Sequence, residues 1–194
     1  RRQRQSCIRD SQRPGQQARK PVEDARRTVA RVLHAARPAE ITFTSGGTES
    51  DVQALYTGAA LGAAAGKRHI ISTQIEHHAV LHTLKKLEKE GFTVELLPVG
   101  PIGTVTAQQV KDAIREDTCL VSVMYANNEI GSILPISEIG AVCRAAGVLF
   151  HTDAVQAAGH LPIDVKVQNI DLLSLSAHLS LIHISEPTRP EPIS

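Results

Sequence analysis

The sequence predicts an α/β fold in which a mostly parallel, doubly wound sheet lies between two layers of helices. Segments of strand-like composition alternate with amphipathic or alanine-rich segments along most of the 194 residues. Several of the strand-like segments are apolar throughout, which is typical of parallel strands whose two faces are both covered by helices. Such strands are joined by right-handed crossovers, and the expected product is a three-layer domain.

The predicted elements follow one another in a regular order. A helix with one apolar stripe is expected over 15–36, a short strand at 40–44, and a glycine turn that opens an alanine-rich helix over 45–66. The remaining strands are expected at 69–73, 93–99, 119–126, 148–153 and 171–177, and the remaining helices at 78–91, 106–117 and 135–147.

Composition excludes several classes of protein. The net charge is only +1, and 42% of the residues are hydrophobic, so one domain with a substantial core is expected. We find no membrane-length apolar run and no signal-peptide core, which favours a cytoplasmic protein without a membrane partner. With 3% aromatic residues and no recognisable module, no nucleic-acid partner is expected. Three cysteines without CxxC spacing argue against a disulfide framework.

Polar residues follow five of the predicted strands, at the strand ends where open α/β sheets bind ligands. After the strand at 40–44 comes the stretch SGGTES, in which Gly46, Gly47 and Thr48 resemble a phosphate cradle at a helix start. An ordinary glycine turn, with Thr48 or Ser45 as the N-cap, is the alternative. His77, the stretch NNEIG at 127–131, Asp153 and His178 follow the other four strands. Together, these five strand ends predict a ligand-binding site at one edge of the sheet.

Four motifs give the chain a resemblance to cysteine desulfurases, which are pyridoxal-phosphate enzymes of the class V aminotransferase group. The motifs are FTSGGTES, EHHAVL, NNEIGSILPI and HTDAVQAAGHLPIDV, and the resemblance runs from about Gly15 to His178. It implies the large domain of the pyridoxal-phosphate fold type I, here truncated. It also implies a homodimer that removes sulfur from L-cysteine as a persulfide and leaves L-alanine. A sulfur acceptor or an iron–sulfur scaffold protein would be the partner, for synthesis of iron–sulfur clusters or thiolated cofactors.

The resemblance also assigns cofactor-binding roles. Gly47 and Thr48 would bind the phosphate, and His77 would stack on the pyridine ring. Asn128 would lie beside the ring and the substrate, whereas Asn127 would hold the turn.

Four more residues complete this expected set. Asp153 would pair with the pyridinium nitrogen, although a helix N-cap is its alternative role. Gln156 would donate to the ring hydroxyl oxygen, or would be an exposed helix residue. Ser176 and His178 would complete the contacts to the phosphate and the ring.

The catalytic groups of the resembled family are missing. The lysine that forms the Schiff base would follow His178, where this chain has Leu179, and the nucleophilic cysteine would lie beyond residue 194. We therefore expect no catalytic residue and no activity. A selenocysteine lyase, another class V aminotransferase, and a non-catalytic relative that acts as a binding partner are the alternatives.

Both ends of the chain depart from the predicted pattern. Residues 1–14 lack periodicity and are expected to be disordered or artefactual, and 15–178 to form a partial cofactor-binding large domain. Residues 179–194 resemble a translated sequencing adapter, so we interpret them as a non-native tail.

No metal site is expected. His78 and His82 have helical i, i+4 spacing beside Glu76 and His77, but the order EHHxxxH is not HExxH and no further ligand cluster accompanies it.

Overall fold

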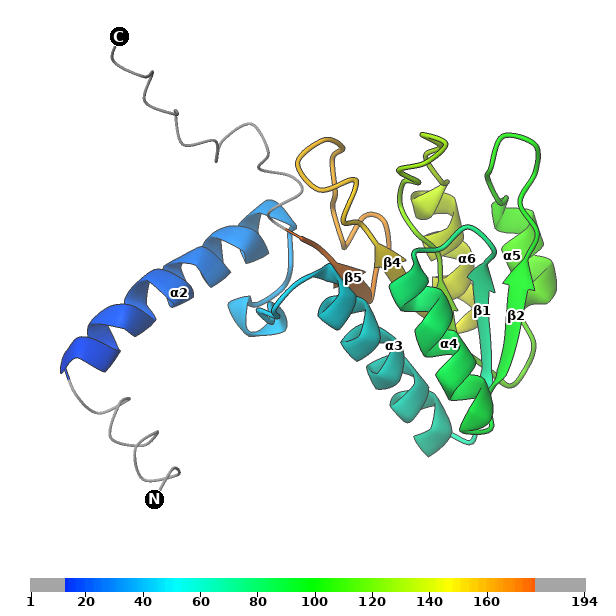
Figure 1. Ribbon diagram of the computed structural model, residues 1–194, viewed down its shortest axis with the longest axis horizontal. Helices are drawn as coiled ribbons and strands as arrows, with labels where there is room; N and C mark the ends of the chain where they lie inside the picture. The colour runs from blue at the N-terminus through cyan, green and yellow to red at the C-terminus, as the bar shows by residue number, and fades with distance from the viewer. Residues whose placement is uncertain (1–12, 177–194) are drawn as a thin grey trace, which may run out of the picture. The chain divides into compact units, whose positions relative to one another are not determined.

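The computed structural model describes residues 13–176, with side chains from Arg19 onward, and the chain forms two compact units (Figure 1). The described part of the first unit is 13–43 with 164–166, and that of the second is 44–163 with 167–176. Within residues 13–176, no helix is long and apolar enough to cross a membrane.

The first unit contains helix α2 (Arg13–Val32) and the short 3-10 helix η1 (Pro38–Glu40). The strand predicted at 40–44 is absent, and this prediction was wrong. Arg26 of α2 donates to the carbonyl of Ile41 and lies over the ring of Phe43. The carbonyl of Ile41 therefore bonds to a side chain instead of to a neighbouring strand. Among the described residues, no strand pairs with this segment, so its strand-like composition is not enough to form a strand.

The second unit contains a five-stranded sheet in which every neighbouring pair is parallel. The strands lie in the order β2 (Thr93–Leu97), β1 (His69–Thr73), β3 (Thr118–Ser122), β4 (Leu149–Asp153) and β5 (Leu172–Ser174). The central strands β1 and β3 are buried at every residue, whereas in the edge strand β2 only Leu97 is buried. The five strands predicted between 69 and 177 are therefore confirmed, with ends that differ by a few residues.

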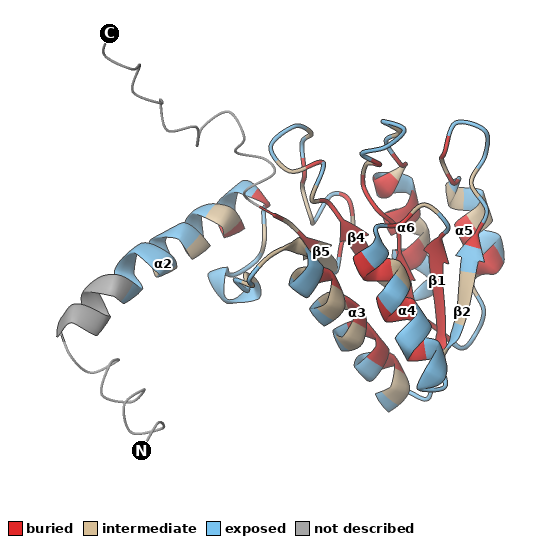
Figure 2. Ribbon diagram, in the orientation of Figure 1, coloured by how far each residue is buried: buried red, intermediate tan, exposed pale blue. Residues whose placement is uncertain are grey.

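Helices cover both faces of this sheet and complete the three predicted layers. Helices α3 (Gly47–Ala64) and α4 (His78–Lys89) pack together on one face, and α5 (Ala107–Ala113) and α6 (Ile136–Ala146) on the other (Figure 1). Figure 2 shows buried residues on the strands and on the helix sides that face them. The predicted α/β class is confirmed.

Small residues allow α3 to lie close to β3. Leu55 and Ala59 of α3 are fully buried against Leu120, and the glycines Gly58 and Gly62 lie on the same side of the helix. A Cβ atom on Gly62 would lie 2.4 Å from the Cβ atom of Cys119, which is closer than real Cβ contacts. The absence of a side chain at Gly62 therefore sets the distance between the helix and the sheet.

We expect Gly62→Ala to destabilise the fold, because the added methyl group meets Cys119 in strand β3. The cost should be about 1–3 kcal/mol in the free energy of unfolding, measured by urea denaturation. Gly58→Ala is the matched control, since its Cβ would lie 3.0 Å from the movable end of Leu120 and should cost less. Equal stability of the two variants would contradict this packing.

Candidate cofactor site

A cavity of about 210 Å³ opens where the carboxyl ends of the strands meet the start of α3. The strand order 2-1-3-4-5 reverses direction between β1 and β3, and ligands of doubly wound sheets bind at such a point. The residues that line the cavity are Gly47, Thr48, Asp51, His77, Met124, Asn128, Asp153, Val155, Gln156 and Ser176.

The start of α3 forms one wall of the cavity. Gly46, the N-cap residue, supplies no side-chain cap, so the first amide groups of α3 remain available for an anion. The turn before the helix is fixed by its own side chains: Thr44 donates to the carbonyl of Gly46, and the Glu49 carboxylate accepts from the amide of Ser45. A Cβ atom on Gly47 would lie 3.0 Å from Val155, so a side chain there would narrow the cavity.

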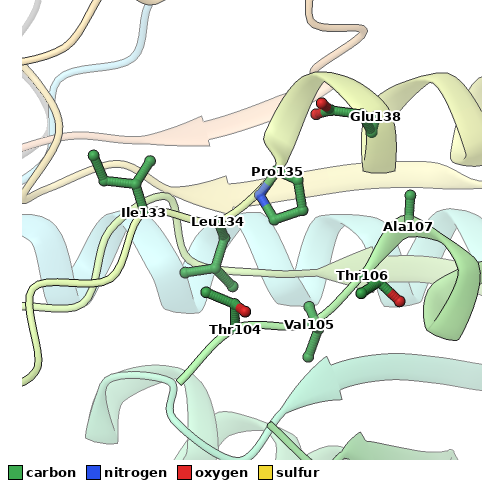
Figure 3. Close-up of a pocket in the computed structure, with 8 residues that line it drawn as sticks. All are labelled: Thr104, Val105, Thr106, Ala107, Ile133, Leu134, Pro135 and Glu138. Atoms are coloured by element: carbon green, nitrogen blue, oxygen red, sulfur yellow. The ribbon is translucent and has the colours of Figure 1, made fainter. Parts of the chain in front are cut away.

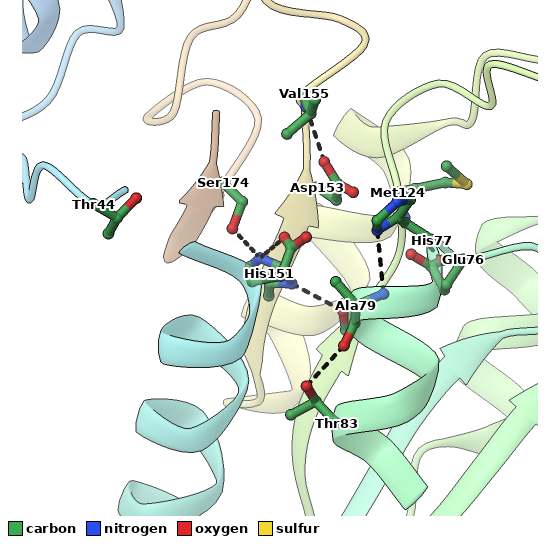
Figure 4. Close-up of polar contacts among 12 residues, drawn as sticks. Thr44, Glu76, His77, Ala79, Thr83, Met124, His151, Asp153, Val155 and Ser174 are labelled. Carbon is green, nitrogen blue, oxygen red and sulfur yellow. Dashed lines mark hydrogen bonds and ion pairs between the residues drawn. The ribbon is translucent and has the colours of Figure 1, made fainter. Parts of the chain in front are cut away.

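The imidazole of His77 reaches the cavity from the start of α4. Its Nδ1 atom accepts from the amide of Ala79 at 3.2 Å, so the side chain is the N-cap of the helix (Figure 4). This bond fixes one ring nitrogen and leaves the exposed ring face available to a planar ligand.

The loop after β3 supplies Asn128. Its neighbour Asn127 is buried and holds the turn, as expected: its side-chain oxygen accepts from the amides of Glu129 and Ile130, and its amide group donates to the carbonyl of Ile75. The side chain of Asn128 is exposed and lines the cavity.

Asp153 ends β4 and is 7% exposed. Its Oδ1 atom accepts from the amide of Val155 at 2.9 Å (Figure 4). Burial raises the pKa of Asp153, although this amide and a charge on His77 act in the opposite direction. No α-helix follows it at 154–160, so the helix N-cap is not its role. A cation placed against this carboxyl group would restore its charged form.

A second buried carboxyl group lies in the same cavity wall. Asp51 of α3 is 1% exposed, and the nearest basic atom is Nε2 of His151, 3.8 Å from its Oδ1 atom. Burial and the charge of Asp153 raise the pKa of Asp51 to about 7, while a hydrogen bond with Ser174 lowers it. The imidazole of His151 contacts Ser122 and Ser174 at 2.9 and 3.0 Å, and burial lowers its pKa to about 4.

Sequence reasoning placed seven described residues in this site, and all seven line the one cavity: Gly47, Thr48, His77, Asn128, Asp153, Gln156 and Ser176. His178 lies outside the described residues. Asp51, Met124 and Val155 were missed. Asp51 carried a usable signal, because an acidic residue on the buried stripe of an alanine-rich helix is unusual.

A second hollow, of about 530 Å³, lies on the surface of the same unit between the segments 104–107 and 133–138 (Figure 3). Glu138 is the one ionisable side chain in its lining. Binding sites combine apolar walls with several convergent polar groups, so the cavity at the strand ends is the better candidate. Within residues 13–176, no group of three or more His, Cys, Asp or Glu side chains is arranged to hold a metal ion.

An anion-binding helix start, an imidazole and a buried carboxyl group around one cavity suit a flat, phosphorylated ring with a basic nitrogen. On a three-layer α/β domain, this combination is that of the pyridoxal-phosphate proteins of fold type I. The sequence profile of the family described as "Aminotransferase class-V" matches residues 2–181, and the chain belongs to this family. The family depends on pyridoxal phosphate.

Similar proteins are cysteine desulfurases. The chain is 55% identical over 164 residues to the "Putative cysteine desulfurase IscS 1" of Bacillus subtilis (strain 168), which covers 84% of this chain and 43% of the relative. The structure "SspA in complex with cysteine" superposes with a TM-score of 0.82 at 40% identity over 88% of this chain and 49% of that one. For a "NifS-like protein" the TM-score is 0.81 at 40% identity, over 87% and 46%. The chain thus spans less than half the length of these proteins.

The stability of the fold should depend on pH through Asp51. Because folding raises its pKa from 3.8 to about 7, the folded state holds the proton more tightly, and stability falls as pH rises through that range. Asp51→Asn removes this effect. From pH 5 to pH 8, the free energy of unfolding of the unsubstituted chain should fall by about 2–3 kcal/mol more than that of the variant.

Urea denaturation at the two pH values measures this difference. His151, with its lowered pKa, contributes the opposite slope below pH 6.5, but it is present in both proteins and cancels. Asp112→Asn, at an exposed position of α5, is the control and should leave the pH profile unchanged. An Asp51→Asn profile parallel to that of the unsubstituted chain would show that Asp51 does not titrate in this range.

Proposed function

We propose that this chain is a fragment of a cysteine desulfurase that provides the pyridoxal-phosphate site. The single observation that carries the proposal is the convergence of seven sequence-predicted residues, from five separate segments, on one cavity with a buried acid. The similarity to several cysteine desulfurases supports L-cysteine as the substrate. The whole protein would be a cytoplasmic homodimer that passes sulfur to an acceptor or an iron–sulfur scaffold protein.

The residues around the cavity would each act on a different part of the cofactor. The amide groups at Gly47 and Thr48 would bind the phosphate. The His77 ring would stack on the pyridine, and the Asp153 carboxylate would hold a proton on the ring nitrogen. When bound, the cofactor supplies an electron sink for the carbanion formed from the substrate.

Side chains at the open edge of the cavity would orient the cofactor and the substrate. Asn128 and Gln156 are exposed and can donate to ring and substrate oxygens, while Ser176 lies beside Gly47. In the complete reaction a cysteine thiolate would attack the sulfur of L-cysteine and form a persulfide. The C–S bond would break with its electron pair on the β-carbon, which would take up a proton to give L-alanine.

Leu179 would affect turnover. The family position after His178 is that of the lysine amine, and a leucine cannot bond to the cofactor or transfer a proton. We propose that the chain binds the cofactor without covalent attachment and is inactive alone. The same leucine favours, as a second candidate, a non-catalytic relative that keeps the pocket as a partner of an active enzyme.

We expect Asp153→Asn to weaken the binding of pyridoxal phosphate about 10–100-fold, because asparagine cannot balance a protonated ring nitrogen. Isothermal titration calorimetry of the purified chain measures the affinity. Asp112→Asn removes an exposed carboxylate of the same type and should leave the affinity unchanged. The absence of any saturable binding by the unsubstituted chain would refute the proposed function.

Leu179→Lys should restore covalent attachment. Lysine amines bond to the carbonyl of this cofactor, so borohydride reduction should fix it to residue 179. Peptide mass mapping should find this adduct in Leu179→Lys and not in the unsubstituted chain. Ser180→Lys, a lysine one residue further along, is the control. Equal labelling of both lysines would mean that position 179 does not face the cofactor.

A further inference from the structure

Glu76 joins the ends of the two central strands beside the cavity. Its Oε1 atom accepts from the hydroxyl of Thr73 at 2.7 Å, at the end of β1, and from the amide of Met124 at 2.9 Å, just beyond β3. Glu76 and Met124 are labelled in Figure 4. The side chain is 5% exposed, so both bonds are shielded from water. Glu76 does not line the cavity itself, whereas the residue after it, His77, and Met124 do.

We propose that Glu76 is a positioning residue: its carboxyl group ties the end of β1 to the end of β3 and so holds His77 against the ring of the cofactor. The inference rests on the proposed cofactor site and assigns to Glu76 a role distinct from those of the residues that touch the ligand.

The segment that carries His77 has few other attachments to β3. The amide group of Asn127 donates to the carbonyl of Ile75 at 3.0 Å, and the bonds of Glu76 are the second connection between this segment and the β3 end. The ring of His77 is fixed in turn by its own bond to the amide of Ala79. Without the Glu76 carboxyl group, the bond between Asn127 and Ile75 would be the remaining hydrogen bond between this segment and the β3 end among the described residues.

The charge on Glu76 decides whether this attachment is stable. Burial raises the pKa of Glu76 to about 8, the bonds from Thr73 and Met124 lower it, and the charges of Asp153 and Asp51 raise it. The charged groups that act on it from α3 and β4 are therefore both carboxyl groups, and His77 adjoins it on α4. Its Oε2 atom has no hydrogen-bond partner among the described residues. An ionised Glu76 would thus hold a buried charge with one unpaired oxygen, which favours movement of the segment toward water.

Two substitutions separate the shape of Glu76 from its charge. Glutamine keeps an oxygen that accepts from Thr73 and Met124 and cannot ionise, whereas alanine removes the connection. Two quantities would be measured in the full chain: the ring resonances of His77 in 13C- and 15N-histidine-labelled protein, assigned with His77→Asn, and the affinity for pyridoxal phosphate. Glu138→Gln, at an exposed glutamate of α6, is the control.

We expect Glu76→Ala to shift and broaden the His77 resonances and to weaken cofactor binding about tenfold or more. Glu76→Gln should preserve both the resonances and the affinity at pH 7. In the unsubstituted chain the His77 resonances should change with a midpoint near pH 8, and Glu76→Gln should abolish this transition. The pH titration needs no damaging substitution, so it decides the question even if Glu76→Ala does not fold.

Three outcomes would overturn the inference: His77 resonances that ignore Glu76→Ala, a Glu76→Gln variant as impaired as Glu76→Ala, or a high-pH transition that survives Glu76→Gln. Failure of the proposed function looks different. In that case the unsubstituted chain would not bind pyridoxal phosphate, while the dependence of the His77 resonances on Glu76 would remain.

Discussion

The site depends on three carboxyl groups, Asp51, Glu76 and Asp153, buried at one edge of the sheet. Burial alone raises the pKa of each, and a charge on one makes ionisation of the others harder. Burial and mutual repulsion together favour a state in which only one of the three carboxyl groups is ionised. Asp153 accepts from the amide of Val155, and a charge on His77 also favours its ionised form. In the proposed site, a cation against Asp153 would favour its ionised form, and that charge would in turn favour the neutral forms of Asp51 and Glu76.

Tight packing of α3 against the sheet shields these carboxyl groups from water. Glycines and alanines bring α3 against β3, which buries Asp51 beneath the start of the helix. The same helix start presents its unpaired amides to the cavity, so one element both supplies the anion site and shields the acid. Parallel pairing then brings the ends of β1, β3, β4 and β5 to one edge. A looser helix would admit water and let all three acids ionise.

The sheet and the place of the candidate site could be predicted because both follow local rules, whereas Gln156 and Ser176 were assigned from the family resemblance. Apolar runs mark buried parallel strands, and polar residues after them must meet at one edge. The strand predicted at 40–44 does not form, because β propensity alone does not provide a neighbouring strand for pairing. Glu76 could not be recognised as a connector, since its partners, Thr73 and the amide of Met124, are 3 and 48 residues away. Hydrogen bonds between distant segments produce no periodic residue pattern from which they could be predicted.

In the proposed site, cofactor binding and turnover would depend on different residues. Every described residue of the cavity wall belongs to the second compact unit, from Gly47 at the start of α3 to Ser176 after β5. The phosphate, ring and nitrogen contacts proposed here are made by that unit and need no amine. Covalent attachment and sulfur transfer need two further groups, a lysine and a cysteine thiol, and neither is among the described residues of the wall. Under the proposed function, a leucine at position 179 would remove the amine that the chemistry needs, while the cofactor contacts of the described wall would remain.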